Sequence, residues 1–172
     1  MEPKGEDVPM GSAQAARMLG RLMLSWDGQW FLKVAEACGL EKAVALTARV
    51  RASFAKIEMR ELMRAEGVEA VRDLHHAVEL LMDYQRVFLG EGMAAQPAVE
   101  GGAVRVGVTR CRPQEGASKA GLRPDTPCIA CERLWNTWLE SLLPGTRWET
   151  EIRGSLGRGA SACEIWVREV AG

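Results

Sequence analysis

The sequence lacks three features that would point to particular partners: a strong net charge, a long apolar run and an N-terminal signal pattern. Its 172 residues hold 22 lysines and arginines against 23 acids, for a net charge of -1 at pH 7, which excludes a broad electrostatic surface for nucleic acid or anionic membranes. No stretch approaches the roughly 18 apolar residues of a membrane span. The start, MEPKGEDVPMGSAQ, is polar and mixed in charge. We therefore expect a cytoplasmic protein with no nucleic-acid or membrane partner.

The residues that are present are typical of one globular domain. Hydrophobic residues make up 47% of the chain and charged residues 26%, and a chain of this length can bury most of its apolar surface without cross-links. We expect a flexible N-terminus over residues 1–20 and a single domain over residues 21–172. Its helical half is expected at about 21–92, and its sheet and cysteine half at about 102–171.

Apolar residues recur at helical spacing in three segments of the first half. Ser25 or Asp27 can cap the first helix, and Gly39 can end it. The second and third helices are expected over residues 41–66 and 71–88, each shortly before a glycine. The pattern therefore predicts a layer of three amphipathic helices.

The periodicity changes after a connector rich in glycine, proline and alanine at residues 91–102. Apolar residues then alternate over 104–108, and again over 148–152 and 163–167 on either side of a glycine-rich turn. Alternation of this kind predicts a strand and a later β-hairpin. Together the two halves predict an α+β fold, in which an N-terminal helical layer packs on a small antiparallel sheet and a cysteine-bearing helix lies between the strands.

Three of the five cysteines fall in CRPQEGASKAGLRPDTPCIAC, residues 111–131. Thr126-Pro127 is a helix-start signal, which places Cys128 in the first turn, where backbone N–H groups favour a thiolate. It should be the most reactive thiol. Cys131 lies one turn further and shares an inward stripe with two tryptophans, Trp135 and Trp138.

The sequence is compatible with four different roles for these cysteines. As a metal site, Cys111, Cys128, Cys131 and Cys163 have the spacing C-x16-C-x2-C-x31-C, which suits a zinc ion or an iron–sulfur cluster. As a redox couple, Cys128 and Cys131 lie at a helix start. Cysteine is also often buried, and Cys38 and Cys163 fit apolar stripes. A catalytic cysteine without a metal is the fourth reading.

Other polar and aromatic residues have both a purely structural and a functional interpretation. His75, Glu79 and Asp83 are spaced by four, which fits a metal or acid–base set and equally a solvated helix face. Asp27 is a cap or a pocket carboxylate, and Glu36 lies close to an apolar stripe. The tryptophans Trp30, Trp135 and Trp138 either fill the core or line a ligand pocket between the two layers.

Several segments resemble a poorly characterised prokaryotic family related to the L-2-amino-thiazoline-4-carboxylate hydrolases. They are SWDGQWFLKVAEACGLEKAV, RVRASFAKIEMRELM, CRPQEGASKAGLRPDTPC and the terminal CEIWV, and the resemblance covers about residues 22–170. The family's elements fall on Asp27, Gly28, Trp30, Phe31, Glu36, Gly39, Cys111, Arg112, Gln114, Gly121, Leu122, Cys128 and Cys163. The chain departs from some members, since it has GSLGRGAS where they carry a second cysteine pair, and it has Cys131 instead.

The resemblance implies a hydrolase that opens a cyclic C–N bond of a small heterocycle. A metal-bound or Cys128-activated water would attack, with Asp27 or Glu36 as the proton carrier. The alternative is a protein that binds a metal or an iron–sulfur cluster without catalysis, for electron transfer or sensing. The expected partner is a small-molecule ligand or substrate, and a homo-oligomer is a further option.

Overall fold

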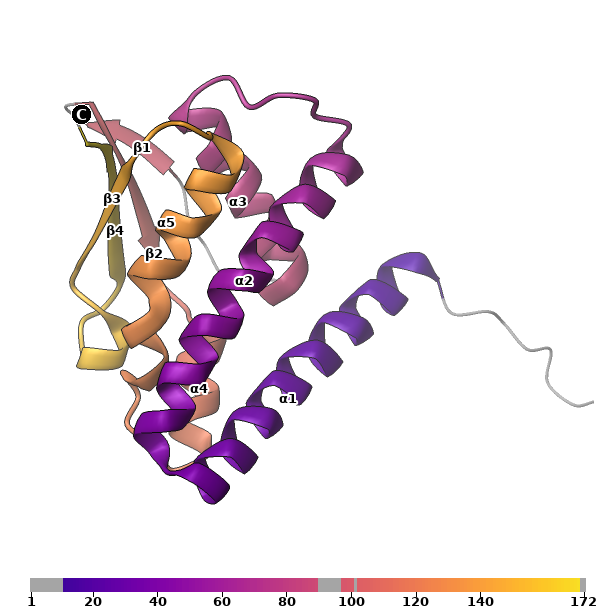
Figure 1. The fold of residues 1–172 in the computed structure, drawn as a ribbon, viewed down its shortest axis with the longest axis vertical. Helices are drawn as coiled ribbons and strands as arrows, with labels where there is room; N and C mark the ends of the chain where they lie inside the picture. The colour runs from indigo at the N-terminus through magenta and orange to yellow at the C-terminus, as the bar shows by residue number, and fades with distance from the viewer. Residues whose placement is uncertain (1–10, 90–96, 101, 171–172) are drawn as a thin grey trace, which may run out of the picture.

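The computed structural model describes residues 11–89, 97–100 and 102–170 (Figure 1). In chain order, its elements are α1 (Ser12–Cys38), α2 (Leu40–Glu66), α3 (Leu74–Leu89), β1 (Pro97–Glu100), β2 (Ala103–Val108), α4 (Arg112–Lys119), the 3-10 helix η1 (Thr126–Ala130), α5 (Cys131–Leu142), β3 (Trp148–Arg153), the 3-10 helix η2 (Leu156–Arg158) and β4 (Cys163–Glu169). The predicted α+β class, with helices on a small antiparallel sheet, is confirmed.

The four described strands form one antiparallel sheet in the order β1-β2-β4-β3. Ile165 of β4 pairs with Val106 on one side and with Ile152 on the other, so apolar side chains line up across one face of the sheet. Helix α5 packs against β3, and α3 packs against β1 and β2. This face of the sheet therefore forms one wall of the core.

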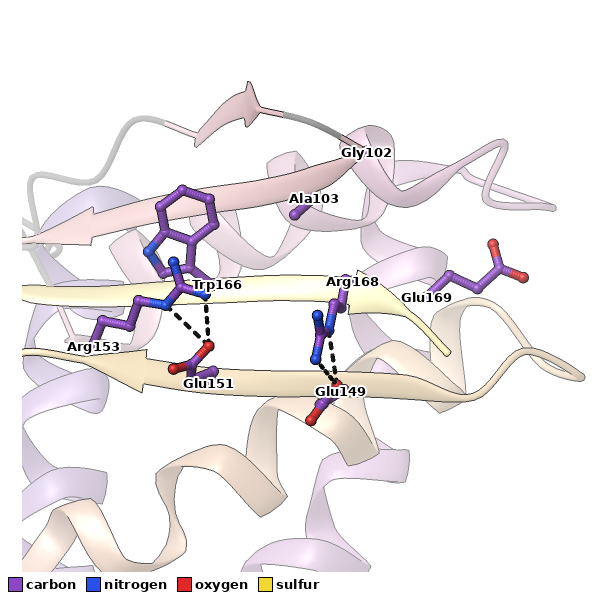
Figure 2. A pocket seen from close by; sticks show the side chains of 8 residues that line it. All are labelled: Gly102, Ala103, Glu149, Glu151, Arg153, Trp166, Arg168 and Glu169. Carbon is purple, nitrogen blue, oxygen red and sulfur yellow. Dashed lines mark hydrogen bonds and ion pairs between the residues drawn. The ribbon is translucent and has the colours of Figure 1, made fainter. Parts of the chain in front are cut away.

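The opposite face of the sheet is charged (Figure 2). Glu151 and Glu149 pair with Arg153 and Arg168, and the Arg153 guanidinium stacks on the Trp166 ring at 4.5 Å from its centroid. The hollow between these side chains is about 330 Å³. Because the charges neutralise one another, we read this face as a solvated surface rather than a ligand site.

The core lies between α2, α3, α5 and the inner face of the sheet. Trp135, Met59 and Leu81 are among its fully buried side chains, and each such burial contributes about 1.5–3 kcal/mol. Helix α1 is different, because none of its residues is buried. In Figure 1 it diverges from α2 with distance from the Gly39 connection.

Two boundaries in the helical half follow the sequence prediction, and one does not. Helix α2 ends at Gly67, whose φ of 64° is the left-handed conformation that glycine adopts at helix ends, and Gly39 separates α1 from α2. The first helix, however, begins at Ser12 and not at Ser25 or Asp27. Alanine, leucine, methionine and arginine dominate the preceding turns, and these strong helix formers extend it into the predicted tail.

Three elements of the second half also differ from the prediction. Strand β1 lies inside the stretch predicted as a connector, whose residues 91–96 and 101 are outside the described residues. The short helix α4 was not predicted; it starts after Cys111 with a proline in its first turn and is anchored by the buried Ala117. The helix predicted to begin at Thr126 is a 3-10 turn first, and the α-helix begins at Cys131.

Candidate functional site

A cavity of about 910 Å³ lies between α1 and the elements that carry the cysteines. Helices α1, α2 and α3 contribute one side of it, and α4, η1, α5 and β4 the other. Its apolar wall includes Leu24, Phe31, Val44, Phe88, Leu134 and Trp135. The cavity thus places the loosely packed α1 opposite the cysteine-bearing elements of the second half of the chain.

Four of the five thiols line this cavity: Cys111, Cys128, Cys131 and Cys163. Two of them contact the turn that starts η2. The Cys128 sulfur lies 3.3 Å from the Ser155 hydroxyl, and the Leu156 N–H donates to the Cys163 sulfur at 3.2 Å. The fold therefore brings together thiols from three separate segments, although Cys38 is exposed at the end of α1, away from them.

Burial raises the pKa of two of these thiols. The pKa of Cys111 rises to about 11, first because the side chain is desolvated and then because thiolates at Cys163 and Cys128 would repel its own. The pKa of Cys131 is raised further for the same reasons. Both groups therefore remain protonated near neutral pH, where they behave as apolar lining and not as nucleophiles.

Among the described residues, no group of three or more Cys, His, Asp or Glu side chains is arranged to hold a metal ion. The metal-binding function predicted from the cysteine spacing is therefore wrong. The four sulfurs belong to the cavity lining, and two of them are engaged by Ser155 and by the Leu156 N–H. A zinc or iron–sulfur cofactor stays an untested prediction, as does the high reactivity of Cys128.

Basic side chains line the cavity beside the apolar wall. Arg51 pairs with Asp27 at 2.5 Å, and Arg110 pairs with Glu115 at 2.6 Å. Three further cations line the cavity and form no ion pair within the described part of the chain: Arg21, Arg112 and Lys119. The cavity therefore carries an excess of positive charge next to an apolar surface.

A buried polar contact lies behind the cavity wall. The Trp138 indole N–H donates to Glu58 at 2.7 Å, with both side chains buried. Burial, followed by the charge of the nearby Glu58, raises the pKa of Tyr84 well above its usual range. Trp138 lines the cavity beside Tyr84, whose ring it meets edge-on with centroids 5.8 Å apart, so this contact fixes one aromatic wall of the cavity.

The residues predicted from the sequence to act together are separated in the structure. Asp27 lies within α1, where it pairs with Arg51 and is not a cap. Glu36 is exposed and pairs with Lys33. Trp30 is exposed and does not line the cavity, whereas Trp135 and Trp138 do. Asp27 is thus the one predicted proton carrier that reaches the cavity, and it does so as an ion pair.

The polar stripe of α3 is a solvated helix face. His75 lies 3.6 Å from Glu79, and Asp83 pairs with Arg86 one turn further on. All four side chains are about half exposed. Ion pairs at this spacing are ordinary on helix surfaces, and the arrangement offers no enclosed site.

Sequence reasoning missed the cationic lining and helix α4. One signal was available for Arg51: it shares a helical stripe with Val44 and Ala55, and an arginine on a stripe that is otherwise apolar often faces a polar group within the fold. For Arg21, Arg112 and Lys119 no such signal exists, because their positions around the cavity depend on how α1 and α4 are placed.

Comparisons with known proteins support the fold and no more. No family model and no curated protein matches the chain. A solved structure with a similar fold is that of a trafficking protein particle complex subunit 3 from Naegleria fowleri, covalently bound to palmitic acid. The TM-score is 0.61 at 15% identity, and the match covers 90% of this chain and 97% of that chain.

These findings overturn the resemblance to the thiazoline-carboxylate hydrolases. The fold is shared with a trafficking subunit, no match supports a hydrolase, and the predicted metal-activated water lacks a metal site in the described residues. Several residues that carried the resemblance have other places in this fold: Asp27 pairs with Arg51 inside α1, and Trp30 is exposed on the same helix. Short motifs of this kind recur in unrelated folds. Within the described part of the chain, no helix is both long and apolar enough to cross a membrane.

Proposed function

We propose that this protein binds a long-chain fatty acid or fatty acyl group in the cavity between α1 and the cysteine-bearing elements. One observation carries the proposal: an apolar cavity of about 910 Å³ is lined by three cations that have no ion-pair partner among the described residues. An apolar wall favours a hydrocarbon chain, and unpaired cations beside it favour an anionic end group. A fatty acid has both parts in one molecule.

The shape and chemistry of the walls suit a hydrocarbon chain. Ligand cavities usually measure roughly 300–1,000 Å³, and this one lies within that range. Aromatic and aliphatic side chains from α1, α3 and α5 face it, and Cys111 and Cys131 add thiols that stay neutral because their pKa values are raised. Each methylene transferred from water to such a surface contributes about 0.8 kcal/mol.

The polar end of the ligand is expected near α4. Arg112 and Lys119 belong to that helix, and Arg21 lines the cavity from α1. A carboxylate paired with an arginine forms charge-assisted hydrogen bonds, which are about twice as strong as neutral ones. The carboxylate would therefore orient the ligand with its chain toward Trp135 and Phe31.

The structural neighbour adds independent support. It is a protein of similar fold that is covalently bound to palmitic acid, and this chain has thiols in the cavity described above. The likeness at 15% identity shows the fold alone, so the acyl ligand is our proposal for this chain. The cytoplasm, where thiols remain reduced, is the compartment in which we expect such a cavity to work.

Titration of the purified protein with palmitate, followed by tryptophan fluorescence, tests the proposal. We expect saturable binding of palmitate and weaker binding of hexadecanol, which has the same chain without the charge. The double variant Arg112→Gln/Lys119→Gln should lose most of the preference for palmitate and keep the affinity for hexadecanol. Arg153→Gln, on the charged outer face of the sheet, is the matched control and should change neither affinity.

Intact-mass measurement before and after hydroxylamine separates a thioester from non-covalent binding. A mass increase that hydroxylamine removes would place the acyl group on a cysteine, and lipid recovered only by solvent extraction would show reversible binding. If palmitate neither binds nor copurifies, or if it binds with the same affinity as hexadecanol in the wild-type protein, the proposed ligand is wrong.

A further inference from the structure

The apolar stripe of α3 that faces the core contains one polar residue. Val78, Leu81, Gln85 and Phe88 follow one another at spacings of three, four and three residues, so they share one side of the helix. Val78 and Leu81 are fully buried, and Gln85 is only 5% exposed. An apolar side chain is the ordinary occupant of such a position, because burying an amide costs free energy unless it is hydrogen-bonded.

The Gln85 amide has no hydrogen-bond partner within the described part of the chain. It is also not one of the side-chain groups that are sealed off without a partner, as the second carboxylate oxygen of Glu58 is. Gln85 lines the cavity of about 910 Å³, so its amide is accessible from the cavity. The fold thus keeps a polar group at a core position and leaves its donor and its acceptor free for a molecule in the cavity.

The charges near this amide favour a neutral ligand group. The ion pair of Asp27 and Arg51 lines the same cavity. Burial and the charge of Glu58 raise the pKa of Tyr84, the residue before Gln85, and the charge of Arg51 lowers it, so both charges lie near this part of α3. Two carboxylates against one guanidinium leave a negative excess, which disfavours a second anionic group there.

We propose that the Gln85 amide is a second polar subsite of the cavity, which binds a hydroxyl group on the hydrocarbon chain of the ligand. The inference rests on the proposed function, since it adds a preference for a hydroxy fatty acid to a fatty-acid site. A hydroxyl both donates and accepts hydrogen bonds, as the amide does, so the two groups can satisfy each other. A plain alkyl chain would instead cover the amide and leave it unpaired.

The hydroxyl is expected far from the carboxylate of the ligand. The cations proposed for the carboxylate on α4 are Arg112 and Lys119, whereas Gln85 belongs to α3. Figure 1 shows α4 below α3 along the long axis of the view, so the two helices reach different parts of the cavity. The ligand would therefore be an acid that is hydroxylated toward the end of its chain and not beside its carboxylate.

Dissociation constants of palmitate and ω-hydroxypalmitate, measured by calorimetry on the full chain, test the subsite. The variant Gln85→Met keeps the length of the side chain and removes the amide, so it should bind palmitate more tightly and ω-hydroxypalmitate more weakly than the wild-type protein does. We expect the ratio of the two constants to change by about tenfold or more, because a buried polar group is no longer left unpaired by palmitate. For 2-hydroxypalmitate, whose hydroxyl lies beside the carboxylate, the variant should behave as it does toward palmitate.

Gln29→Met is the matched control. Gln29 lines the same cavity but is exposed, so water satisfies its amide, and this variant should keep the wild-type ratio of dissociation constants. Thermal unfolding without ligand gives a second readout. Gln85→Met should raise the unfolding temperature by about 2–4 °C, since it removes an unpaired buried amide, whereas Gln29→Met should leave it unchanged.

Three results would overturn the subsite. If palmitate binds but the ratio is the same in the wild-type protein and in Gln85→Met, the subsite is wrong and the proposed fatty-acid site stands. Tighter binding of hexadecanedioate than of ω-hydroxypalmitate would show that this part of the cavity takes an anion. A lower unfolding temperature of Gln85→Met would show that the amide already has a partner. If neither palmitate nor ω-hydroxypalmitate binds, the proposed function fails, and the subsite fails with it.

Discussion

Trp138 of α5 donates its indole N–H to Glu58 of α2 at 2.7 Å, which joins two helices across 80 positions of sequence. Both side chains are buried, and the second carboxylate oxygen of Glu58 has no hydrogen-bond partner. A buried carboxylate is costly without a partner, so the single indole donor compensates much of that cost. The contact fixes one wall of the cavity to the helical layer.

Trp138→Phe is expected to destabilise the protein by about 2 kcal/mol more than Trp148→Phe, because it removes the indole donor from the buried Glu58. Trp148 is the matched control: it is buried too, but its indole N–H has no partner, so the phenylalanine loses only ring volume. Urea unfolding measures both free energies. Equal losses in the two variants would show that the hydrogen bond contributes nothing.

Tyr84 is expected to stay protonated in the folded protein well above pH 10, the ordinary pKa of a tyrosine. Burial and then the charge of Glu58 raise its pKa, and it is the single tyrosine of the chain, so absorbance at alkaline pH reports it alone. The folded state holds this proton more tightly than the unfolded state. Stability from this group is therefore complete below about pH 10 and is lost as the pH rises further.

In the alkaline titration, tyrosinate should appear together with unfolding and not before it. Glu58→Gln removes the negative charge, so the tyrosinate of that variant should form at a lower pH than in the wild-type protein while burial still holds it above the ordinary value. A reversible titration near pH 10 with the fold intact would contradict the assignment.

Alkylation should distinguish the cavity thiols from the exposed Cys38. The pKa of Cys111 is raised to about 11 and that of Cys131 is raised as well, so at pH 7.5 both should react with iodoacetamide at least about tenfold more slowly than Cys38. The rate at Cys111 should climb until about pH 11. Timed alkylation and peptide mass spectrometry measure each site, and in urea the differences should vanish. Faster modification of Cys111 than of Cys38 in the folded protein would be incompatible with this order.

Gly157→Ala is expected to destabilise the contact between η1 and η2 by about 1–3 kcal/mol, as overpacked sites usually do. A Cβ atom there would lie 2.8 Å from the Pro124 carbonyl oxygen and 3.0 Å from the Cys128 sulfur. Gly116→Ala in α4 is the matched control, since its Cβ would meet nothing within 4 Å and alanine favours a helix by roughly 0.5–1 kcal/mol. Thermal unfolding compares them, and a neutral Gly157→Ala would mean that the two turns separate readily.

Local patterns in the sequence were sufficient for most of the elements. The end of α2 at Gly67 and the pairing of Trp148–Arg153 with Cys163–Glu169 follow from helical spacing, alternation and glycine positions, which depend on neighbours a few residues away. Where propensity was strong but no cap was visible, as from Ser12 to Leu24, the prediction failed. Helix α4 was not predicted, because its eight residues are too few to show a helical periodicity.

The sequence predicted which cysteines and tryptophans belong to the candidate site, but not how the remaining residues are arranged around it. The sequence indicated four cysteines and two tryptophans near one another, and all of them line the cavity. It also suggested that Trp30 and Glu36 face the same site, whereas both are exposed on α1. Helical spacing shows which residues share a side of a helix, but it does not show what that side meets.

The α+β class, the division into a helical half and a sheet half, and the apolar side of each helix can all be predicted from local patterns in the chain. The pairing of Asp27 with Arg51, the placement of four thiols in one cavity lining with no metal-holding group among the described residues, and the exposed apolar residues of α1 are visible in the folded structure alone. Propensity and periodicity act over a few residues, whereas a cavity or an ion pair between helices depends on how distant elements pack together.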